Sequence, residues 1–133
     1  AVADAARALL LAEHGFAAAY TRDEMLSGAR ASESLFGALE KSWHPDVSGD
    51  VQYTLKPHWM FGVRANGAVH GSPYDYDNHV PILFFGPAWI GMGRVDSRVE
   101  VVDIAPTLAA LLGITPPATA EGQVLPLVKP RRR

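Results

Sequence analysis

The spacing of hydrophobic residues in the N-terminal part of the chain predicts a helix followed by a strand. From Val2 to His14, apolar residues recur every three or four positions, and Gly15 can end the helix. The apolar run Phe16–Tyr20 is too short for a helix and predicts a buried strand. A helix that leads directly into a buried strand indicates the α/β class.

Two elements are predicted in the middle of the chain. A helix is expected from about Ser32 to Trp43, with Ser32 as its cap and Pro45 closing it. Alternation of apolar and polar residues over Asp50–Lys56 predicts a strand with one face in water, and Thr54 belongs to that face.

Two further elements are predicted in the C-terminal half. The segment Val80–Phe85 is apolar on both faces and predicts a strand inside a covered sheet. Acidic and proline residues at the start of Asp103–Leu112, with Gly113 beyond its end, predict a helix. The proline-rich residues 115–130 are expected to run along the surface, and residues 126–133 to form a flexible tail.

Length and charge narrow the class of protein. The 133 residues suit one ordinary domain, and a hydrophobic content of 48% excludes a disordered tail. Twelve basic residues against 14 acidic ones give a formal charge of −2, so neither nucleic acid nor a membrane surface is an expected partner. The absence of cysteine removes disulfides and cysteine-ligated zinc.

The long polar stretch between Lys56 and Val80 contains the candidate chemistry. Stretches of this length inside a compact domain are usually binding or catalytic loops. Its metal-ligating side chains lie within ten positions: His70, Asp75, Asp77 and His79. Imidazole and carboxylate are the ligands that zinc accepts when sulfur is absent. From the residues alone, a metal site and a polar surface turn both remain open.

Three blocks of sequence resemble the C-terminal part of the alkaline phosphatase superfamily: VSGDVQYTLKP, VHGSPYDYDNHVPILFFGP and VVDIAPTLAALLGI. The most similar branch is the monomeric bacterial alkaline phosphatases, which are related to the nucleotide pyrophosphatase/phosphodiesterases. The resemblance spans roughly Gly15 to Leu125. It implies that residues 1–133 are a single C-terminal portion of an α/β catalytic domain, in which helices flank a large sheet.

The resemblance also implies a role for His70. In this family, two zinc ions bind at the C-terminal ends of the strands, and an upstream threonine or serine attacks phosphorus. The histidine of the His-Gly pair is a zinc ligand, which corresponds to His70 here. Asp75 and Asp77 are candidates for holding the second ring nitrogen of that histidine, although local turn hydrogen bonds explain them equally well. His79 is interpreted as structural.

The remaining parts of such a site have no counterpart in this sequence. The nucleophile block, the aspartate ligands and the adjacent Asp-His pair are expected in an N-terminal portion preceding Ala1. That portion and a phosphate ester are therefore the expected partners. The resemblance implies a periplasmic or secreted two-zinc hydrolase of phosphate monoesters or diesters. This chain would supply one zinc ligand at most, no catalytic nucleophile and no activity alone.

Two other interpretations stay open. A freestanding, noncatalytic binding module derived from the phosphatase fold would show a polar, solvated sheet edge. A self-contained metal-binding module would gather the four side chains His70, Asp75, Asp77 and His79 in one cluster.

Several other residues receive structural interpretations. These are His14, His44 and His58, the Ser48–Asp50 turn before a strand, and Thr107 at a helix start. The aromatic residues that bracket the loop can line a substrate cleft or pack beneath the loop, and packing is the more frequent case. They are Trp59, Phe61, Tyr74 and Tyr76.

Overall fold

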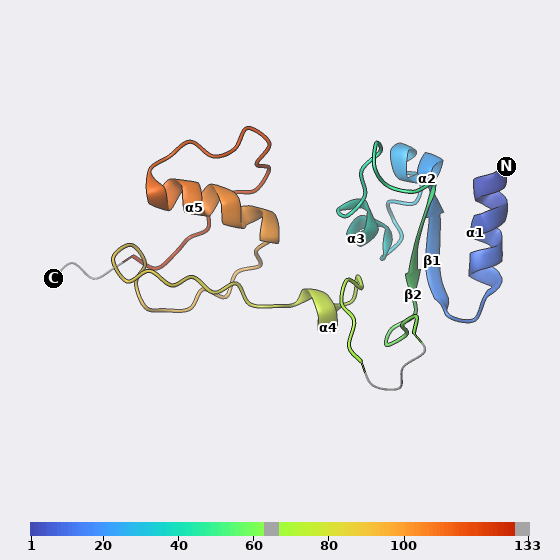
Figure 1. The fold of residues 1–133 in the computed structure, drawn as a ribbon, viewed down its shortest axis with the longest axis horizontal. Coiled ribbons are helices and arrows are strands. Elements are labelled where there is room, and N and C mark those ends of the chain that lie inside the picture. The colour runs from blue at the N-terminus through green and yellow to red at the C-terminus, as the bar shows by residue number, and fades with distance from the viewer. Residues whose placement is uncertain (63–66, 130–133) are drawn as a thin grey trace. The chain divides into compact units, whose positions relative to one another are not determined.

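A computed structural model of the protein describes residues 1–62 and 67–129. In chain order its elements are α1 (Val2–Ala12), β1 (Phe16–Thr21), α2 (Arg22–Ser27), α3 (Phe36–Glu40), β2 (Val51–Leu55), α4 (Asp75–Asn78), the 3-10 turn η1 (Val101–Asp103) and α5 (Ile104–Leu112) (Figure 1). The contacts divide the chain into two compact units, Ala1–Val80 and Pro81–Arg133. Membership of both units in one catalytic domain stays a prediction. None of the helices in the described ranges is long and apolar enough to cross a membrane.

The first unit is built on an antiparallel pair of strands. Residues of β1 pair with β2 from Phe16 opposite Leu55 to Thr21 opposite Val51, with an irregularity at Ala17. The mixed α/β class is confirmed, and over the described residues the sheet contains these two strands. The helix α1 packs against β1 (Figure 1).

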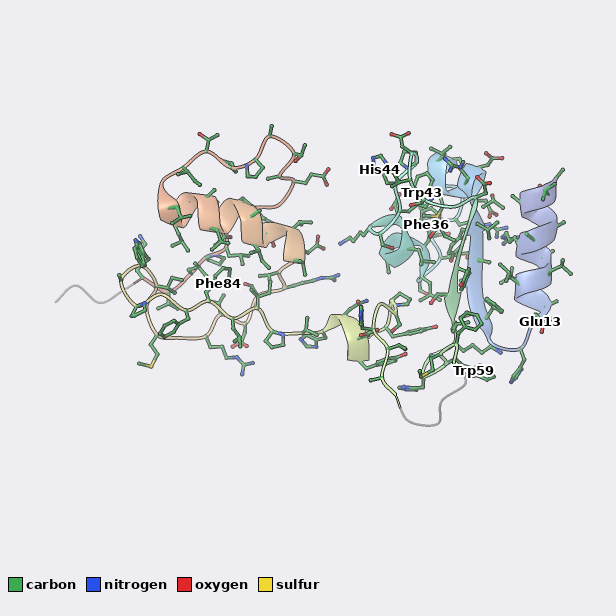
Figure 2. All side chains as sticks on the ribbon, viewed as in Figure 1. Glu13, Phe36, Trp43, His44, Trp59 and Phe84 are labelled. Atoms are coloured by element: carbon green, nitrogen blue, oxygen red, sulfur yellow. The ribbon has the colours of Figure 1, made fainter. Side chains whose placement is uncertain are left out.

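The core of this unit lies between β1 and the short helices. Ala18 and Tyr20 of β1 pack with Met25 of α2 and Phe36 of α3, all of them buried. Trp43 covers this cluster from the same segment as Phe36 (Figure 2). The predicted buried strand at residues 16–20 is therefore confirmed. The helix before it is confirmed too, but it ends at Ala12, because Glu13 is already extended, and not at Gly15.

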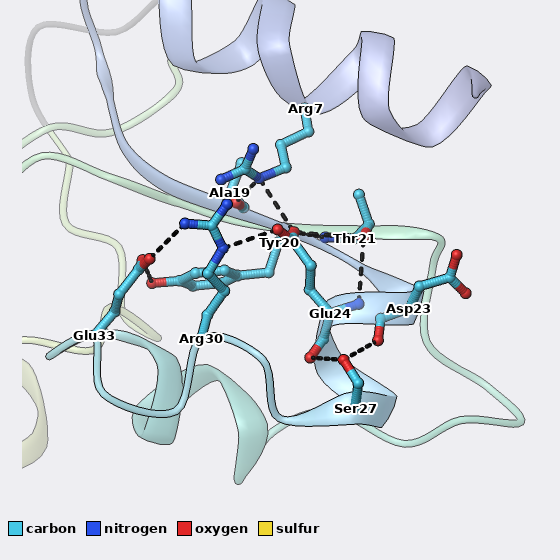
Figure 3. Close-up of polar contacts among 9 residues, drawn as sticks. All are labelled: Arg7, Ala19, Tyr20, Thr21, Asp23, Glu24, Ser27, Arg30 and Glu33. Atoms are coloured by element: carbon cyan, nitrogen blue, oxygen red, sulfur yellow. Dashed lines mark hydrogen bonds and ion pairs between the residues drawn. The ribbon is translucent and has the colours of Figure 1, made fainter.

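A network of charged groups ties α1, β1 and α2 together (Figure 3). The Glu24 carboxylate lies 3.1 Å from Arg7 Nε and 3.0 Å from Arg30 Nε, and it accepts the Thr21 N–H. Arg7 also donates to the carbonyl of Ala19 in β1. Burial alone raises the pKa of Glu24, but the Thr21 N–H and the two arginines outweigh it and hold that pKa below its usual value.

The predicted helix from Ser32 to Trp43 is wrong in length. The observed helix is Phe36–Glu40, and its N-cap is Leu35 without a side-chain cap. The residues between α2 and α3 form turns, in which Arg30 and Glu33 join the charged network. The packing face was predicted correctly because Leu35, Leu39 and Trp43 pack on the buried Phe36.

The predicted water-facing side of β2 is also wrong. Thr54 is only 6% exposed, whereas Tyr53 on the opposite face is 45% exposed. Thr54 lies opposite the buried Ala18, so its face meets the packed core. The small hydroxyl side chain of threonine fits that position without a wet surface.

The segment Val80–Phe85 is not a strand within the described residues, which corrects the prediction of a strand buried on both faces. Leu83 is 87% and Phe85 is 96% exposed, whereas Ile82 and Phe84 are half-buried (Phe84 is labelled in Figure 2). The backbone of residues 82–85 makes no hydrogen bond to any described residue. The physical reason is that a strand needs a neighbour to accept and donate its backbone hydrogen bonds.

The second unit is organised around α5. This helix confirms the one predicted at Asp103–Leu112 in the C-terminal half of the chain. Gly113 ends α5 in the left-handed conformation with φ of 66°. The buried Asp103 carboxylate accepts the N–H groups of Glu100 and Gln123. Thr107, fully buried, donates to the Asp103 carbonyl and accepts the Leu125 N–H. These contacts agree with the structural interpretation of Thr107.

The charged network predicts an alkaline loss of stability that depends on Tyr20. Burial, followed by its hydrogen bond to Glu33, raises the pKa of Tyr20 to about 12, and its side chain is 1% exposed. At pH values below about 10, the pKa of tyrosine in the unfolded chain, Tyr20 is protonated in both states and its full contribution to the free energy of unfolding is present. As pH rises to about 12, the unfolded chain ionises first, so the free energy of unfolding falls by about 1–3 kcal/mol.

Tyr20→Phe should remove this part of the alkaline loss, at a cost of about 1 kcal/mol near neutral pH. Urea unfolding of the chain at a series of pH values measures both effects. Tyr53→Phe, at an exposed position, serves as the matched control and should keep the parental pH dependence. Identical alkaline profiles for Tyr20→Phe and the parent would contradict the role given to Tyr20.

Candidate functional site

The predicted zinc ligand His70 lies at an exposed turn of the first unit. The next residue, Gly71, has φ of 94°, a conformation that side-chain-bearing L residues rarely adopt. Glycine is favoured here by its backbone conformation, since a Cβ at this position would meet no atom within 4 Å. His70 is exposed, and its imidazole makes no hydrogen bond to the described residues.

One carboxylate holds the turn that follows His70. Asp77 Oδ2 accepts the N–H of Ser72 at 2.6 Å. This hydrogen bond is the largest cause of a lowered pKa of Asp77, and the nearby charge of His70 contributes less. Asp77 is half-buried, whereas Asp75 is exposed, although both lie in the single turn of α4. Sequence reasoning named both aspartates without separating them.

Two tyrosines attach this segment to the end of β2. The Tyr74 hydroxyl donates to the carbonyl of Leu55 at 2.8 Å, and the Tyr76 hydroxyl accepts the N–H of His58 at 3.0 Å. The rings of His58 and Tyr76 stack at 4.5 Å, and those of Tyr74 and Tyr76 at 5.8 Å. His58 has φ of 64°, an uncommon value outside glycine, and its contacts with Tyr76 hold it there.

The aromatic residues of the loop contact other rings and backbone, although Trp59, Phe61 and Tyr76 remain 48%, 64% and 54% exposed. Phe61 contacts the rings of Phe16 and Tyr53. The ring of Trp59 covers Gly15, where an added Cβ would lie 3.0 Å from it. These contacts favour the packing interpretation of the aromatic set over a substrate cleft.

The other histidines have structural contacts. His14 lies edge-on to the Trp59 ring at 5.3 Å. In the turn before β2, His44 Nδ1 accepts the N–H of Asp46. Asp50, at the entry to β2, pairs with Arg22 at 3.0 Å. The interpretation of residues 48–50 as a strand entry is confirmed, since β2 begins at Val51.

The structure does not bring the four candidate ligands together. Within the described ranges, no group of three or more histidine, aspartate or glutamate side chains is placed to hold a metal ion. His79 is exposed, and its N–H bonds to the backbone of Asp75. The described residues therefore give no support to a self-contained metal-binding module of His70, Asp75, Asp77 and His79.

The fold and the loop define an α/β protein with an exposed histidine, His70, beside a glycine turn that the Ser72–Asp77 hydrogen bond restrains. Over 109 residues, 77% of its length, the chain is 40% identical to alkaline phosphatase PhoK of Sphingomonas sp.. It is 39% identical over 69 residues to a calcium-transporting ATPase of Myroides odoratus, and 36% identical over 77 residues to alkaline phosphatase PafA of Elizabethkingia meningoseptica. These matches cover 50% and 57% of the chain.

The matches confirm the predicted resemblance, and the chain is an alkaline-phosphatase-like sequence. It spans between 12% and 19% of the length of the three relatives described above. No protein-family model matches the chain.

The tyrosine contacts predict a local effect of Tyr76→Phe. The change removes the acceptor for the His58 N–H but keeps the ring that stacks on His58. Loss of one hydrogen bond of about 1 kcal/mol should speed hydrogen exchange of the His58 amide about fivefold. NMR measures this exchange rate. Tyr53→Phe is the matched control and should leave the rate of the His58 amide unchanged. Equal rates in Tyr76→Phe and the parent would show that the Tyr76 hydroxyl does not hold His58.

Proposed function

We propose that this chain is part of a two-zinc phosphatase that hydrolyses phosphate monoesters or diesters, and that His70 contributes one zinc ligand. The observation that carries the proposal is the similarity to alkaline phosphatases over as much as 77% of the chain. The exposed imidazole on the Gly71 turn supports it, because a ligand must be open to the metal. By the same similarity, we propose a periplasmic or secreted location.

The donor set of this chain fits one position of a zinc ion. Zinc in proteins takes four donors in a tetrahedron, and a catalytic zinc keeps three from the protein. With no group of three ligating side chains in the described parts of the chain, one imidazole is the contribution we assign. The remaining donors and the attacking hydroxyl belong to the rest of the complete enzyme in this proposal, so the isolated chain is expected to be inactive.

In this proposal, the residues of this chain donate one ligand atom to zinc and orient the side chain that carries it. The imidazole of His70 offers a ring nitrogen as the donor, and the Ser72–Asp77 bond restricts the turn that carries it. The tyrosine contacts with β2 fix the distance of this turn from the strand end. When bound, zinc polarises the phosphoryl oxygens and activates an attacking hydroxyl.

The exposure of segment 82–85 supports the proposal that another part of the enzyme completes the fold. Leu83 and Phe85 present two large apolar side chains to solvent, next to backbone groups without hydrogen bonds to the described residues. Once this segment is buried in a sheet, each such group would be costly unless a neighbouring strand satisfied it. We propose that the rest of the phosphatase pairs with and covers this segment. The bare apolar surface also weighs against a freestanding binding module, for which a polar edge was expected.

Replacing His70 tests the proposed ligand in the complete enzyme. His70→Ala should lower both zinc content and nitrophenyl phosphate hydrolysis, with a rate loss of more than about 100-fold. His79→Ala is the matched control, an exposed histidine of the same segment, and should stay within about threefold of the parent. Metal analysis and steady-state kinetics measure the two effects. Turnover by the isolated chain, or a fully active His70→Ala enzyme, would contradict the proposal.

The covering of segment 82–85 has its own test. The chain is mixed with the separately produced remainder of the enzyme, and the dissociation constant is measured by titration. A double change, Leu83→Lys with Phe85→Lys, should weaken association by at least about 100-fold, since two buried apolar side chains are lost. The exposed Val47→Lys should leave it unchanged. Parental affinity of the double variant would show that this segment is not the covered surface.

A further inference from the structure

We propose that Asp77 is a positioning residue for His70, acting through the backbone of Ser72 and not through the imidazole ring. This inference rests on the proposed function, because it takes His70 as the zinc ligand. It differs from the expectation that an aspartate holds the second ring nitrogen directly. The juxtaposition that carries it is a carboxylate bound to the turn two residues beyond the histidine.

The contact itself is short and charged. Asp77 Oδ2 lies 2.6 Å from the Ser72 nitrogen, a distance typical of hydrogen bonds strengthened by an ionised partner. The carboxylate is half-buried, so solvent screens this bond less than it would on an open surface. It joins positions five residues apart and closes the segment Ser72–Asp77 into a loop.

The turn needs such a restraint. Gly71 has φ of 94°, and a Cβ added there would meet no atom within 4 Å. Packing therefore does not confine this residue, and glycine moves between backbone conformations more easily than any other residue. A bond to the following residue is the contact that selects one conformation, and with it the direction in which His70 leaves the turn.

The carboxylate is itself held in place. The N–H of Asp77 donates to the Tyr74 carbonyl at 2.9 Å, and the Tyr74 hydroxyl donates to Leu55 at the end of β2. A continuous series of bonds thus runs from the sheet through Tyr74 and Asp77 to the turn beside His70.

Asp75 provides the contrast within the same turn of helix. Its side chain makes no hydrogen bond to the described residues and is exposed. Removing it changes the local charge as much as removing Asp77 does, but leaves the Ser72 bond intact. Asp75 variants are therefore matched controls for Asp77 variants.

The test uses the complete enzyme loaded with zinc and competed against a chelator. Asp77→Ala should weaken zinc retention by about 10–100-fold, the range for groups that orient a ligand. Asp77→Asn should weaken it less, about threefold, because the amide oxygen still accepts the Ser72 N–H. Asp75→Ala and Asp75→Asn should retain zinc like the parent. Thermal unfolding of the zinc-free proteins should be similar for the two alanine variants, so that a difference in zinc retention reports positioning.

The outcomes separate this inference from the proposed function. If Asp77→Ala retains zinc like the parent while His70→Ala loses it, the inference is wrong and the proposed function stands. If His70→Ala also retains zinc, the proposed function itself fails. Should Asp77→Ala not fold, Asp77→Asn decides, and zinc retention equal to that of Asp75→Asn would overturn the inference.

Discussion

The attachment of the histidine-bearing segment to the end of β2 is the interaction on which the candidate site depends. The segment has one turn of helix, α4, and no strand of its own within the described residues, so its position comes from side-chain contacts. The Tyr74 hydroxyl and the stacked ring of Tyr76 provide these contacts. The contacts of Tyr76 also hold His58 in an uncommon backbone conformation. Strain of this kind persists only where surrounding contacts fix it.

In the proposed function, the site and the sheet both need groups that the described residues do not provide. A single imidazole fills one position of a metal ion, and the apolar segment 82–85 has no neighbouring strand among the described residues. Both features have one explanation if the chain works as part of a larger enzyme, as its coverage of less than a fifth of its relatives allows. A strand and a ligand set that assemble together would couple folding to metal binding.

Sequence periodicity predicted the elements whose environment is local to the chain. The first helix and the strand at residues 16–20 follow from apolar spacing, and the helix before Gly113 follows from apolar spacing and a terminating glycine. The helix α2 was missed, although Thr21 and Glu24 form a capping box that is visible in the sequence. The prediction of a buried strand at residues 80–85 was wrong. Composition shows that a segment has apolar side chains to bury, but not whether this chain contains the strands and helices that would bury them.

At the site, the order of residues identified the glycine turn and a set of candidate ligands, which the described residues do not bring together. It left Asp75 and Asp77 equivalent, since both are acidic residues in the same short helix. The difference between them is a hydrogen bond to Ser72, which depends on the backbone path through Gly71. Such tertiary contacts have no periodic signature, so the structure was needed to separate the two aspartates.

The most direct measurement is a crystal structure of the complete enzyme with zinc bound. The proposed function predicts a ring nitrogen of His70 at about 2.0–2.1 Å from a zinc ion, with the other donors coming from residues outside this chain. A zinc site fully ligated without His70, with that ring turned away into solvent, would contradict it.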